Sequence, residues 1–465
     1  MQRILAIAWL TWKAALRFKL FLVIAALLVA AVVGLPLIVK SDGTAQGFTQ
    51  IILTYTLSAI TALLGFSTLW LSCGTLARDI EECQMQVVAT KPIARWQIWL
   101  GKWLGIVSLN AVLLALAGGC VFGLLQWRAT KLPATEQKAL REQVLVARGA
   151  AKEPDASAEI EADTEQVFQE RLKQNPDFAH LTAAERQEVR QQIREGVKSD
   201  LQLVPPSYQR TWKINLGLAK NDLRGRPLQL RVKFNAANRS PSGTFTARWQ
   251  VGDPPNTPYW RSEPMSLAPD TFHEFAIPPD LFDANGMLTI TFVNPNDTAL
   301  IFPVEDGMEV LYPEGGFAMN FARGLGIIFC WMALLAALGL AAASLLSFPV
   351  AAFFALAMMI VVFSSGTLAE SVESGTVAAG NQEKGIAGHS VADVVLIPAF
   401  KGVLAVVNLA KNFSPIDALS TGRCITWSEL GLAFVQIVLL LGGGFAAVGI
   451  IFFNRRELAT AQGTQ

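Results

Sequence analysis

Long stretches without a single charged side chain are the feature that most constrains the fold of this chain. Asp, Glu, Lys and Arg are all absent from Gly43–Ala77, Trp103–Trp127, Gly324–Ala369 and Leu430–Asn454. An apolar run of about 20 residues is long enough to cross a bilayer as a helix. The third stretch has room for two such helices. The pattern predicts an α-helical polytopic membrane protein.

The N-terminal region adds one more span. An apolar run from Leu20 to Val39 follows three basic residues. This run is longer than the apolar region of a signal peptide, and no small-residue cleavage site closes it, so we expect a retained helix. Six spanning helices are therefore predicted, at about residues 18–39, 48–74, 99–126, 319–346, 349–367 and 430–454.

Basic side chains near the spans predict the orientation. In a six-span arrangement these flanking residues all fall on one side of the membrane: Lys13, Arg17, Lys19, Lys91, Arg95, Lys102, Arg455 and Arg456. Short flanks rich in Lys and Arg stay in the cytoplasm. We expect a protein of the bacterial cytoplasmic (inner) membrane, with both termini in the cytoplasm and residues 128–316 outside.

Composition excludes several classes of function. Hydrophobic residues make up 52% of the chain and charged residues 16%, against roughly 25% charged in an average soluble protein. The net charge of +1 gives no field for nucleic acid. The cysteines form no CxxC motif or Cys/His cluster, so no metal site is predicted.

The exterior insert has two parts. Residues 128–205 are rich in Ala, Glu, Gln and Arg, and Pro154 and Pro176 divide them into about three helices of a stalk. Thr182 and Glu185 have the spacing of a capping box. Residues 206–316 instead alternate apolar and polar side chains over Leu228–Phe234, Thr244–Trp249 and Met287–Val293. This period of two predicts strands, and the length fits a β-sandwich.

The last membrane block, residues 317–465, contains a second exterior segment at 368–429. Within it, Val394–Ala410 is mostly apolar but is interrupted by Lys401. A helix at the membrane interface, or one that enters and leaves on the same side, fits this stretch. A true span would place Arg455 and Arg456 outside, against the charge rule.

The segment 75–98, between the second and third spans, is the most informative for function. Charged residues gather at the membrane exit, an amphipathic stretch follows, and a Lys-Pro pair ends it: Arg78, Asp79, Glu81, Glu82, Lys91 and Pro92. Such a helix could dock a soluble partner. The alternative is an ordinary juxtamembrane loop, anchored by Trp96, Trp99 and Trp103 at the headgroups.

This segment resembles the signature of ABC type-2 transporter permeases, in which an acidic exit precedes a basic, Trp-containing stretch. The matching pairs are Arg78-Asp79, Glu81-Glu82, Lys91-Pro92, Arg95-Trp96 and Gly101-Lys102. The C-terminal part is similar too, at Ser414-Pro415, Asp417, Gly422, Trp427 and Phe453–Leu458. The resemblance covers residues 1–127 and 317–465, and the large insert departs from the simplest members.

The resemblance implies a permease subunit that is not itself an enzyme and exports an unknown substrate. ATP and Mg would be bound by a partner, a dimer of ABC ATPase subunits, since this chain has no phosphate-binding GxxxxGK[ST] loop. A second permease copy or a paralogue would complete the pathway in the lipid bilayer. The residues implied for ATPase coupling are Arg78, Asp79, Glu81, Glu82, Lys91, Pro92 and Arg95.

A receptor without transport activity is the alternative function. In that case the β-sandwich binds an envelope glycan or protein, or transmits mechanical force. Tyr259 and Trp260 follow a Pro-rich turn and are candidates for stacking on a sugar, with core packing as the alternative. Trp249 alternates within a strand and is expected in the core.

Overall fold

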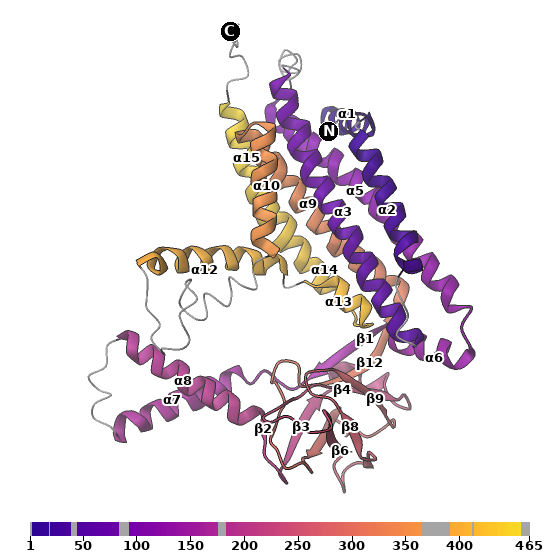
Figure 1. Cartoon of the computed structure of the whole chain (residues 1–465), viewed down its shortest axis with the longest axis vertical. Helices are drawn as coiled ribbons and strands as arrows, with labels where there is room; N and C mark the ends of the chain where they lie inside the picture. The colour runs from indigo at the N-terminus through magenta and orange to yellow at the C-terminus, as the bar shows by residue number, and fades with distance from the viewer. Residues whose placement is uncertain are drawn as a thin grey trace. The chain divides into compact units, whose positions relative to one another are not determined.

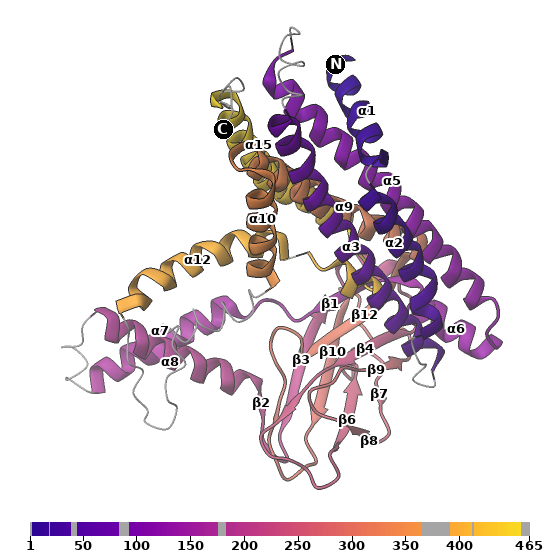
Figure 2. The ribbon, with the colours of Figure 1, turned by 45° about the horizontal axis from the view of Figure 1, so that its top comes forward.

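The chain folds into two compact units. The description rests on a computed structural model and covers residues 2–17, 19–38, 44–82, 93–174, 183–363, 391–411 and 413–456. Residues 1–147 and 315–465 form one unit, here called the helical unit, and residues 148–314 form the other, here called the β unit. Their elements are labelled in Figures 1 and 2.

The helical unit consists of helices, and the β unit is inserted in its chain between α6 and α9. In chain order they are α1 (Gln2–Arg17), α2 (Lys19–Ile38), α3 (Ala45–Glu81), α5 (Arg95–Ala129), α6 (Ala134–Gln143), α9 (Phe317–Leu345), α10 (Phe348–Phe363), α12 (Val391–Lys411), α13 (Pro415–Ser420), α14 (Trp427–Ala433), the π-helical η4 (Phe434–Gly442) and α15 (Gly443–Arg455).

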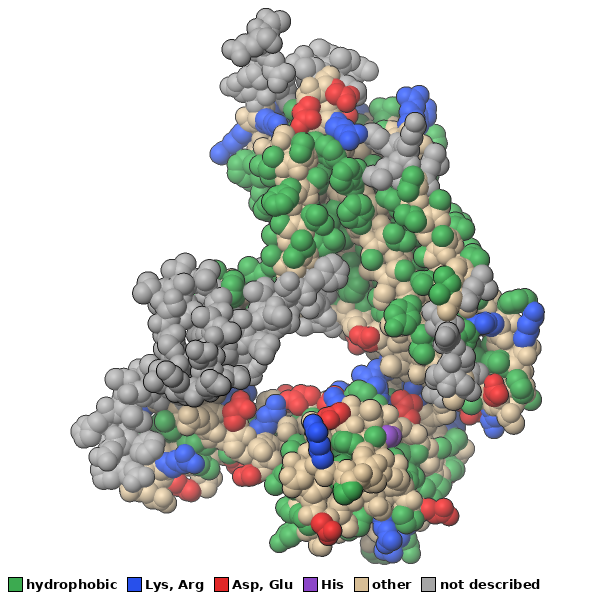
Figure 3. Space-filling model, in the orientation of Figure 1, with side chains coloured by type: hydrophobic (Ala, Val, Ile, Leu, Met, Phe, Trp, Pro, Cys, Tyr) green, Lys and Arg blue, Asp and Glu red, His purple; other side chains and the backbone are tan. Residues whose placement is uncertain are grey.

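Within the described residues, four helices are long and apolar enough to cross a membrane: Gly47–Glu81, Arg95–Ala129, Phe317–Leu345 and Trp427–Arg455. The other two expected spans correspond to α2 and α10, in which the described residues include apolar stretches at Val23–Pro36 and Phe348–Val361. Hydrophobic side chains cover much of the face of the helical unit seen in Figure 3. Exposed apolar surface on this scale is unusual for a water-soluble protein. The prediction of a helical membrane part with a separate β part is confirmed.

Helix α9 lies at the centre of the helical unit, packed against α3, α5, α10, η4 and α15. Small residues allow this close approach. A Cβ on Gly339 would collide with the side chain of Ser72 on α3, and a Cβ on Gly324 would meet Leu419 on α13. The Ala- and Gly-rich sequence of α9 is therefore what lets it serve as the core helix.

Helix α12 covers the apolar stretch that was expected at the interface or re-entrant. It contains Pro398, and Lys401 is exposed. The helix is present as expected, and its relation to the membrane stays a prediction.

The β unit contains three sheets. The first has the order β1 (Val146–Lys152), β12 (Met308–Gly316), β4 (Leu228–Val232) and β9 (His273–Ile277). The second has the order β3 (Gln209–Asn215), β10 (Met287–Val293), β6 (Phe245–Val251) and β7 (Trp260–Arg261), with β8 (Met265–Leu267) also paired to β6. The third is small, with β2 (Leu203–Val204), β11 (Leu300–Ile301) and β5 (Asn235–Ala236). A short 3-10 helix, η2, spans Gly217–Asn221.

Both larger sheets contribute to one hydrophobic core. Trp249 and Phe292 come from the second sheet, and Leu230 and Val310 come from the first. The three strands predicted from alternation are confirmed as β4, β6 and β10. Trp249 is 1% exposed, so its predicted core position is also confirmed.

The polar segment before the sheets forms three helices, as predicted: α6, α7 (Ser157–Gln174) and α8 (Ala183–Gln202). The strand β1 between α6 and α7 was not predicted, because its residues are mostly Ala, Arg and Gly and show no clear alternation. Residues Leu140 and Val144, in and just after α6, belong to the core of the helical unit. The capping box expected at Thr182 and Glu185 lies outside the described residues and side chains.

Candidate functional site at the helix ends

The last turn of α3 carries most of the predicted coupling residues. Helix α3 has 37 residues, which at 1.5 Å per residue is about 55 Å, well beyond a hydrocarbon core of about 30 Å. Arg78, Asp79 and Glu81 therefore continue the second span instead of starting a separate helix. Glu82 follows as the C-cap residue and is exposed.

Asp79 forms an ion pair with Lys102, which lies on the second turn of α5. The Lys102 Nζ atom is 2.5 Å from Asp79 Oδ2 and also donates a hydrogen bond to the Thr75 carbonyl at 2.8 Å. The Lys102 side chain is only 8% exposed, while that of Asp79 is 33% exposed. A lysine amine can be buried in an apolar bundle only with such partners. This pair fastens α5 to the end of α3.

Phe348, the first residue of α10, is held by two other residues of the same turn. Its backbone N–H donates to Glu81 Oε1 at 2.8 Å, and its ring lies 4.4 Å from the guanidinium carbon of Arg78. A carboxylate is favoured at a helix N-terminus by the helix dipole and by the unpaired N–H groups there. A cation over an aromatic ring adds a further attraction. The start of α10 is therefore attached to the end of α3.

Arg95 and Arg456 bind the carboxyl ends of two other helices. Arg95 Nη1 donates to the carbonyls of Phe453, Asn454 and Arg456 at 2.9, 2.8 and 2.8 Å. Arg456 Nη1 in turn donates to two carbonyls in the last turn of α9, at 3.3 and 3.2 Å. The last carbonyls of a helix have no partner within the helix, and a cation there opposes the negative end of the dipole. These two guanidinium groups thus join α5, α9 and α15.

Together these contacts define what is here called the helix-end cluster: Arg78, Asp79, Glu81, Arg95, Lys102, Phe348 and Arg456. In Figure 3, charged side chains gather at the end of the helical unit where α3 finishes. The cluster joins the ends of α3, α5, α9, α10 and α15. Its contacts link the ends of these helices to one another.

The sequence identified part of this cluster. Arg78, Asp79, Glu81 and Arg95 are all in it, while Lys91 and Pro92 lie outside the described residues. The roles of Lys102, Phe348 and Arg456 as contact partners were missed. Lys102 did carry a signal, because a basic residue at the start of an apolar helix calls for a nearby acid. Phe348 carried none, since its contact is through the backbone N–H.

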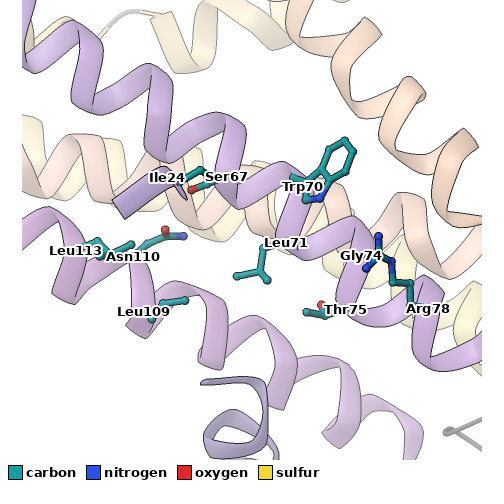
Figure 4. Close-up of a pocket in the computed structure, with 10 residues that line it drawn as sticks. All are labelled: Ile24, Ser67, Trp70, Leu71, Gly74, Thr75, Arg78, Leu109, Asn110 and Leu113. Carbon is teal, nitrogen blue, oxygen red and sulfur yellow. The ribbon is translucent and has the colours of Figure 1, made fainter. Parts of the chain in front are cut away.

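A groove runs along α3 beside the cluster (Figure 4), with about 500 Å³ of open space. Its lining comes from α2, α3 and α5: Ile24, Ser67, Trp70, Leu71, Gly74, Thr75, Arg78, Leu109, Asn110 and Leu113. Asn110 is buried and its Nδ2 donates to Thr68 Oγ1 at 2.8 Å. This polar contact ties α3 to α5 at a second level, before Asp79 on α3 and after Lys102 on α5.

In the β unit, the two aromatic ligand candidates differ in exposure. Tyr259 is 56% exposed, and the Arg261 guanidinium lies 5.6 Å from its ring centroid. Trp260 is half-buried, packs against the core of the β unit and pairs with Val251 of β6. Only Tyr259 therefore offers an open ring face.

The first sheet of the β unit carries a buried ionic network. Glu309 on β12 is 0% exposed and lies 2.9 Å from Lys152 Nζ on β1 and 3.8 Å from Arg231 Nη1 on β4. Glu274 on β9 lies 2.9 Å from Arg148 Nη1 and 3.6 Å from Arg231 Nε. These charges cross all four strands on the face opposite the hydrophobic core.

A second polar region of the β unit lies between the β1–α7 loop, α8 and the loop before β12. Here Lys198 Nζ is 2.7 Å from Glu305 Oε1. The hydrogen bond from Lys198 lowers the pKa of Glu305 below its ordinary value. The neighbouring cavity is lined by Lys152, Arg194 and Lys198 together with Glu153, Asp155 and Glu305, so its charges are balanced.

Comparison of the chain with protein-family models, curated proteins and solved structures found no match. Among the described residues, no group of three or more His, Cys, Asp and Glu side chains is placed to hold a metal ion.

Proposed function

We propose that the chain is the membrane-spanning permease subunit of an ATP-binding cassette transporter. In this proposal six helices span the membrane: α2, α3, α5, α9, α10 and the continuous helix from α14 to α15. Helix α2 has 20 residues, about 30 Å at 1.5 Å per residue, and the described part of α10 has 16. The helix-end cluster then lies on the cytoplasmic side of the inner membrane.

The observation that carries the proposal is the connection of five helix ends in one charged cluster. A partner that displaces the end of α3 would pull on α5 through Asp79 and Lys102, and on α10 through Glu81 and Phe348. A partner shifts a conformational equilibrium only by contacting one state better than the other. A dimer of ATPase subunits that changes shape with ATP and Mg could move α3, α5 and α10 through these contacts and so drive export of a substrate. A second permease copy or a paralogue would complete the pathway.

Docking of an ATPase at the end of α3 requires a side chain that the ATPase can reach. Glu82 is the exposed C-cap residue at the end of α3, where Arg78, Asp79 and Glu81 contact other helices of the chain. We assign Glu82 the direct contact with the ATPase and the other three the transmission of its movement.

The test is co-purification from native membranes in mild detergent, with co-purifying chains identified by mass spectrometry. An ATPase with a phosphate-binding loop is expected with the wild type and is expected to be lost with Glu82→Lys. The matched control is Glu136→Lys, an exposed acid on α6, which should retain the ATPase. If the wild type retains no ATPase, the permease proposal fails. If the ATPase stays bound to Glu82→Lys, Glu82 is not the docking residue.

An envelope receptor is the second candidate, and the exposed ring of Tyr259 favours it. The two larger sheets share one core, and we propose that they form a β-sandwich on the exterior side. If a sugar stacks on the Tyr259 ring, Tyr259→Ala removes the stacking surface and should abolish binding without unfolding the β unit. Binding of the full chain to an envelope glycan array, lost in Tyr259→Ala and kept in Tyr208→Ala, would support this function. Both tyrosines are exposed, at 56% and 66%.

A further inference from the structure

Helix α1 presents an apolar stripe next to basic side chains. Leu5, Trp9 and Leu16 are 64%, 59% and 50% exposed. At about 100° per residue these three side chains lie within about 40° of one another around the helix. The helix contains Arg3, Lys13 and Arg17 and no acidic residue. Its outer surface is therefore both apolar and cationic.

A different face of α1 is fixed against α5. Ala8, Thr11 and Ala15 are buried, and a Cβ on Gly105 would collide with Thr11 at 2.7 Å. Trp12 Nε1 donates a hydrogen bond to Ser108 Oγ at 2.8 Å. Because this face is close-packed, α1 cannot turn to bury its apolar stripe against its own chain.

The position of α1 along the chain places it at a membrane boundary. Helix α2 begins at Lys19, two residues after α1 ends at Arg17. Its partner α5 has 35 residues, which exceeds what a bilayer core of about 30 Å requires. The part of α5 that contacts α1, from Gly101 to Ser108, lies near the start of that helix.

We propose that α1 docks on the surface of an anionic bilayer and binds phospholipid headgroups. Leu5, Trp9 and Leu16 enter the boundary between headgroups and acyl chains, as apolar and aromatic side chains of interfacial helices do. Lys13, whose Nζ lies 5.7 Å from the Trp9 ring centroid, and Arg17 contact the lipid phosphates. The charge complementarity selects an anionic lipid over a zwitterionic one. This inference needs only the membrane helices and does not depend on transport.

The first test counts phospholipids retained by the purified full chain in native mass spectrometry, comparing phosphatidylglycerol with phosphatidylcholine. Each basic residue near an anionic surface changes binding by about fivefold. A triple variant with Arg3→Gln, Lys13→Gln and Arg17→Gln should therefore retain at least tenfold less phosphatidylglycerol. The matched control neutralises three exposed basic residues at the other end of the helical unit: Lys131→Gln, Lys138→Gln and Arg141→Gln. Equal loss in both triple variants, or no loss in the first, would overturn the proposal.

The second test leaves every charge in place. A photo-reactive benzoylphenylalanine replaces Leu5 or Trp9 in the full chain, in native membranes, and replaces the exposed Tyr208 of the β unit as a control. Phospholipid adducts are expected at positions 5 and 9 and absent at 208. Adducts with a protein chain at positions 5 and 9 would make α1 a protein-docking surface and would refute lipid docking.

Discussion

The helical unit and the β unit use charged residues in different ways. In the helix-end cluster, Glu81, Arg95 and Arg456 contact backbone groups at the ends of helices. In the first sheet of the β unit, Glu309 and Glu274 contact the side chains of Arg and Lys on neighbouring strands. One arrangement satisfies unpaired backbone atoms, and the other satisfies buried side chains.

The difference follows from secondary structure. A helix pairs its own backbone everywhere except at its ends, so a charged side chain in an apolar bundle is most useful there. A sheet pairs its backbone with neighbouring strands and sends alternate side chains to opposite faces, so charges gather in rows across strands. Loss of a helix-end contact should therefore act locally, whereas loss of one sheet charge should affect a whole network.

The largest effect is expected for Glu309→Gln in the β unit. The carboxylate is 0% exposed and lies between Lys152, which is 44% exposed, and Arg231, which is 8% exposed. Its loss therefore removes a partner from the buried Arg231 guanidinium, whereas Lys152 can reach water. Breaking a buried ion pair by removing one partner costs about 3–5 kcal/mol. The free energy of unfolding of the β unit is to be measured by pulse proteolysis of the full chain in urea.

The control for this variant is Glu161→Gln, which removes an exposed acid 4.0 Å from Arg194. A surface pair of this kind contributes no more than about 0.5 kcal/mol. Equal effects of Glu309→Gln and Glu161→Gln would show that burial does not decide the strength of these ion pairs. The buried network of the first sheet would then contribute no more to stability than exposed pairs do.

An intermediate effect is expected for the Asp79–Lys102 ion pair of the helix-end cluster. Lys102→Met removes a buried cation and leaves Asp79, which is 33% exposed and can reach water. We expect a loss of about 2 kcal/mol in the free energy of unfolding in detergent. In the double variant Asp79→Asn with Lys102→Met, much of the second loss should disappear, because the two residues interact directly. Strictly additive losses would contradict the pairing.

A smaller and more local effect is expected for Arg95→Met. The guanidinium binds three carbonyls at the end of α15, and Met keeps the length of the side chain but cannot donate. A cation at a helix C-terminus contributes about 1 kcal/mol, which corresponds to about fivefold faster amide hydrogen exchange. The increase should be confined to the last turn of α15. Faster exchange throughout the helical unit would instead indicate that Arg95 supports the whole bundle.

Local patterns in the sequence predicted much of the fold. Charge-free runs identified the long helices α3, α5 and α9, and alternation identified the strands β4, β6 and β10. These features depend only on the periodicity of side chains along one element. Strand β1 was not predicted, because its pairing with β12 is set by residues far along the chain and its own sequence shows no clear alternation.

The candidate site was only partly predictable for the same reason. The acidic and basic residues near the membrane exit were recognisable as a group, but their partners were not. Arg95 binds the carbonyls of Phe453, Asn454 and Arg456, and Glu81 binds the N–H of Phe348. Every residue has a backbone N–H or carbonyl, so a side chain that binds one leaves no signal in the sequence of its partner.

The smallest effect is expected from the exposed ion pair between Lys198 and Glu305. This pair allows the strength of an exposed ion pair of the β unit to be compared with that of the buried network. The Lys198 hydrogen bond lowers the pKa of Glu305 below its ordinary value of 4.5. The pair therefore stabilises the folded state fully above about pH 4.5, and this stabilisation is lost as the pH falls through the lowered pKa. The Glu305 side chain is 64% exposed, so after screening by solvent the contribution is no more than about 0.5 kcal/mol.

The measurement is the free energy of unfolding of the β unit in urea, from pH 6 down to about pH 3. This free energy should depend slightly less on pH in Glu305→Gln than in the wild type. If the two curves stay parallel, the pair contributes nothing measurable; if they diverge by several kcal/mol, an exposed pair is as strong as the buried network, and burial does not explain the difference between the two regions.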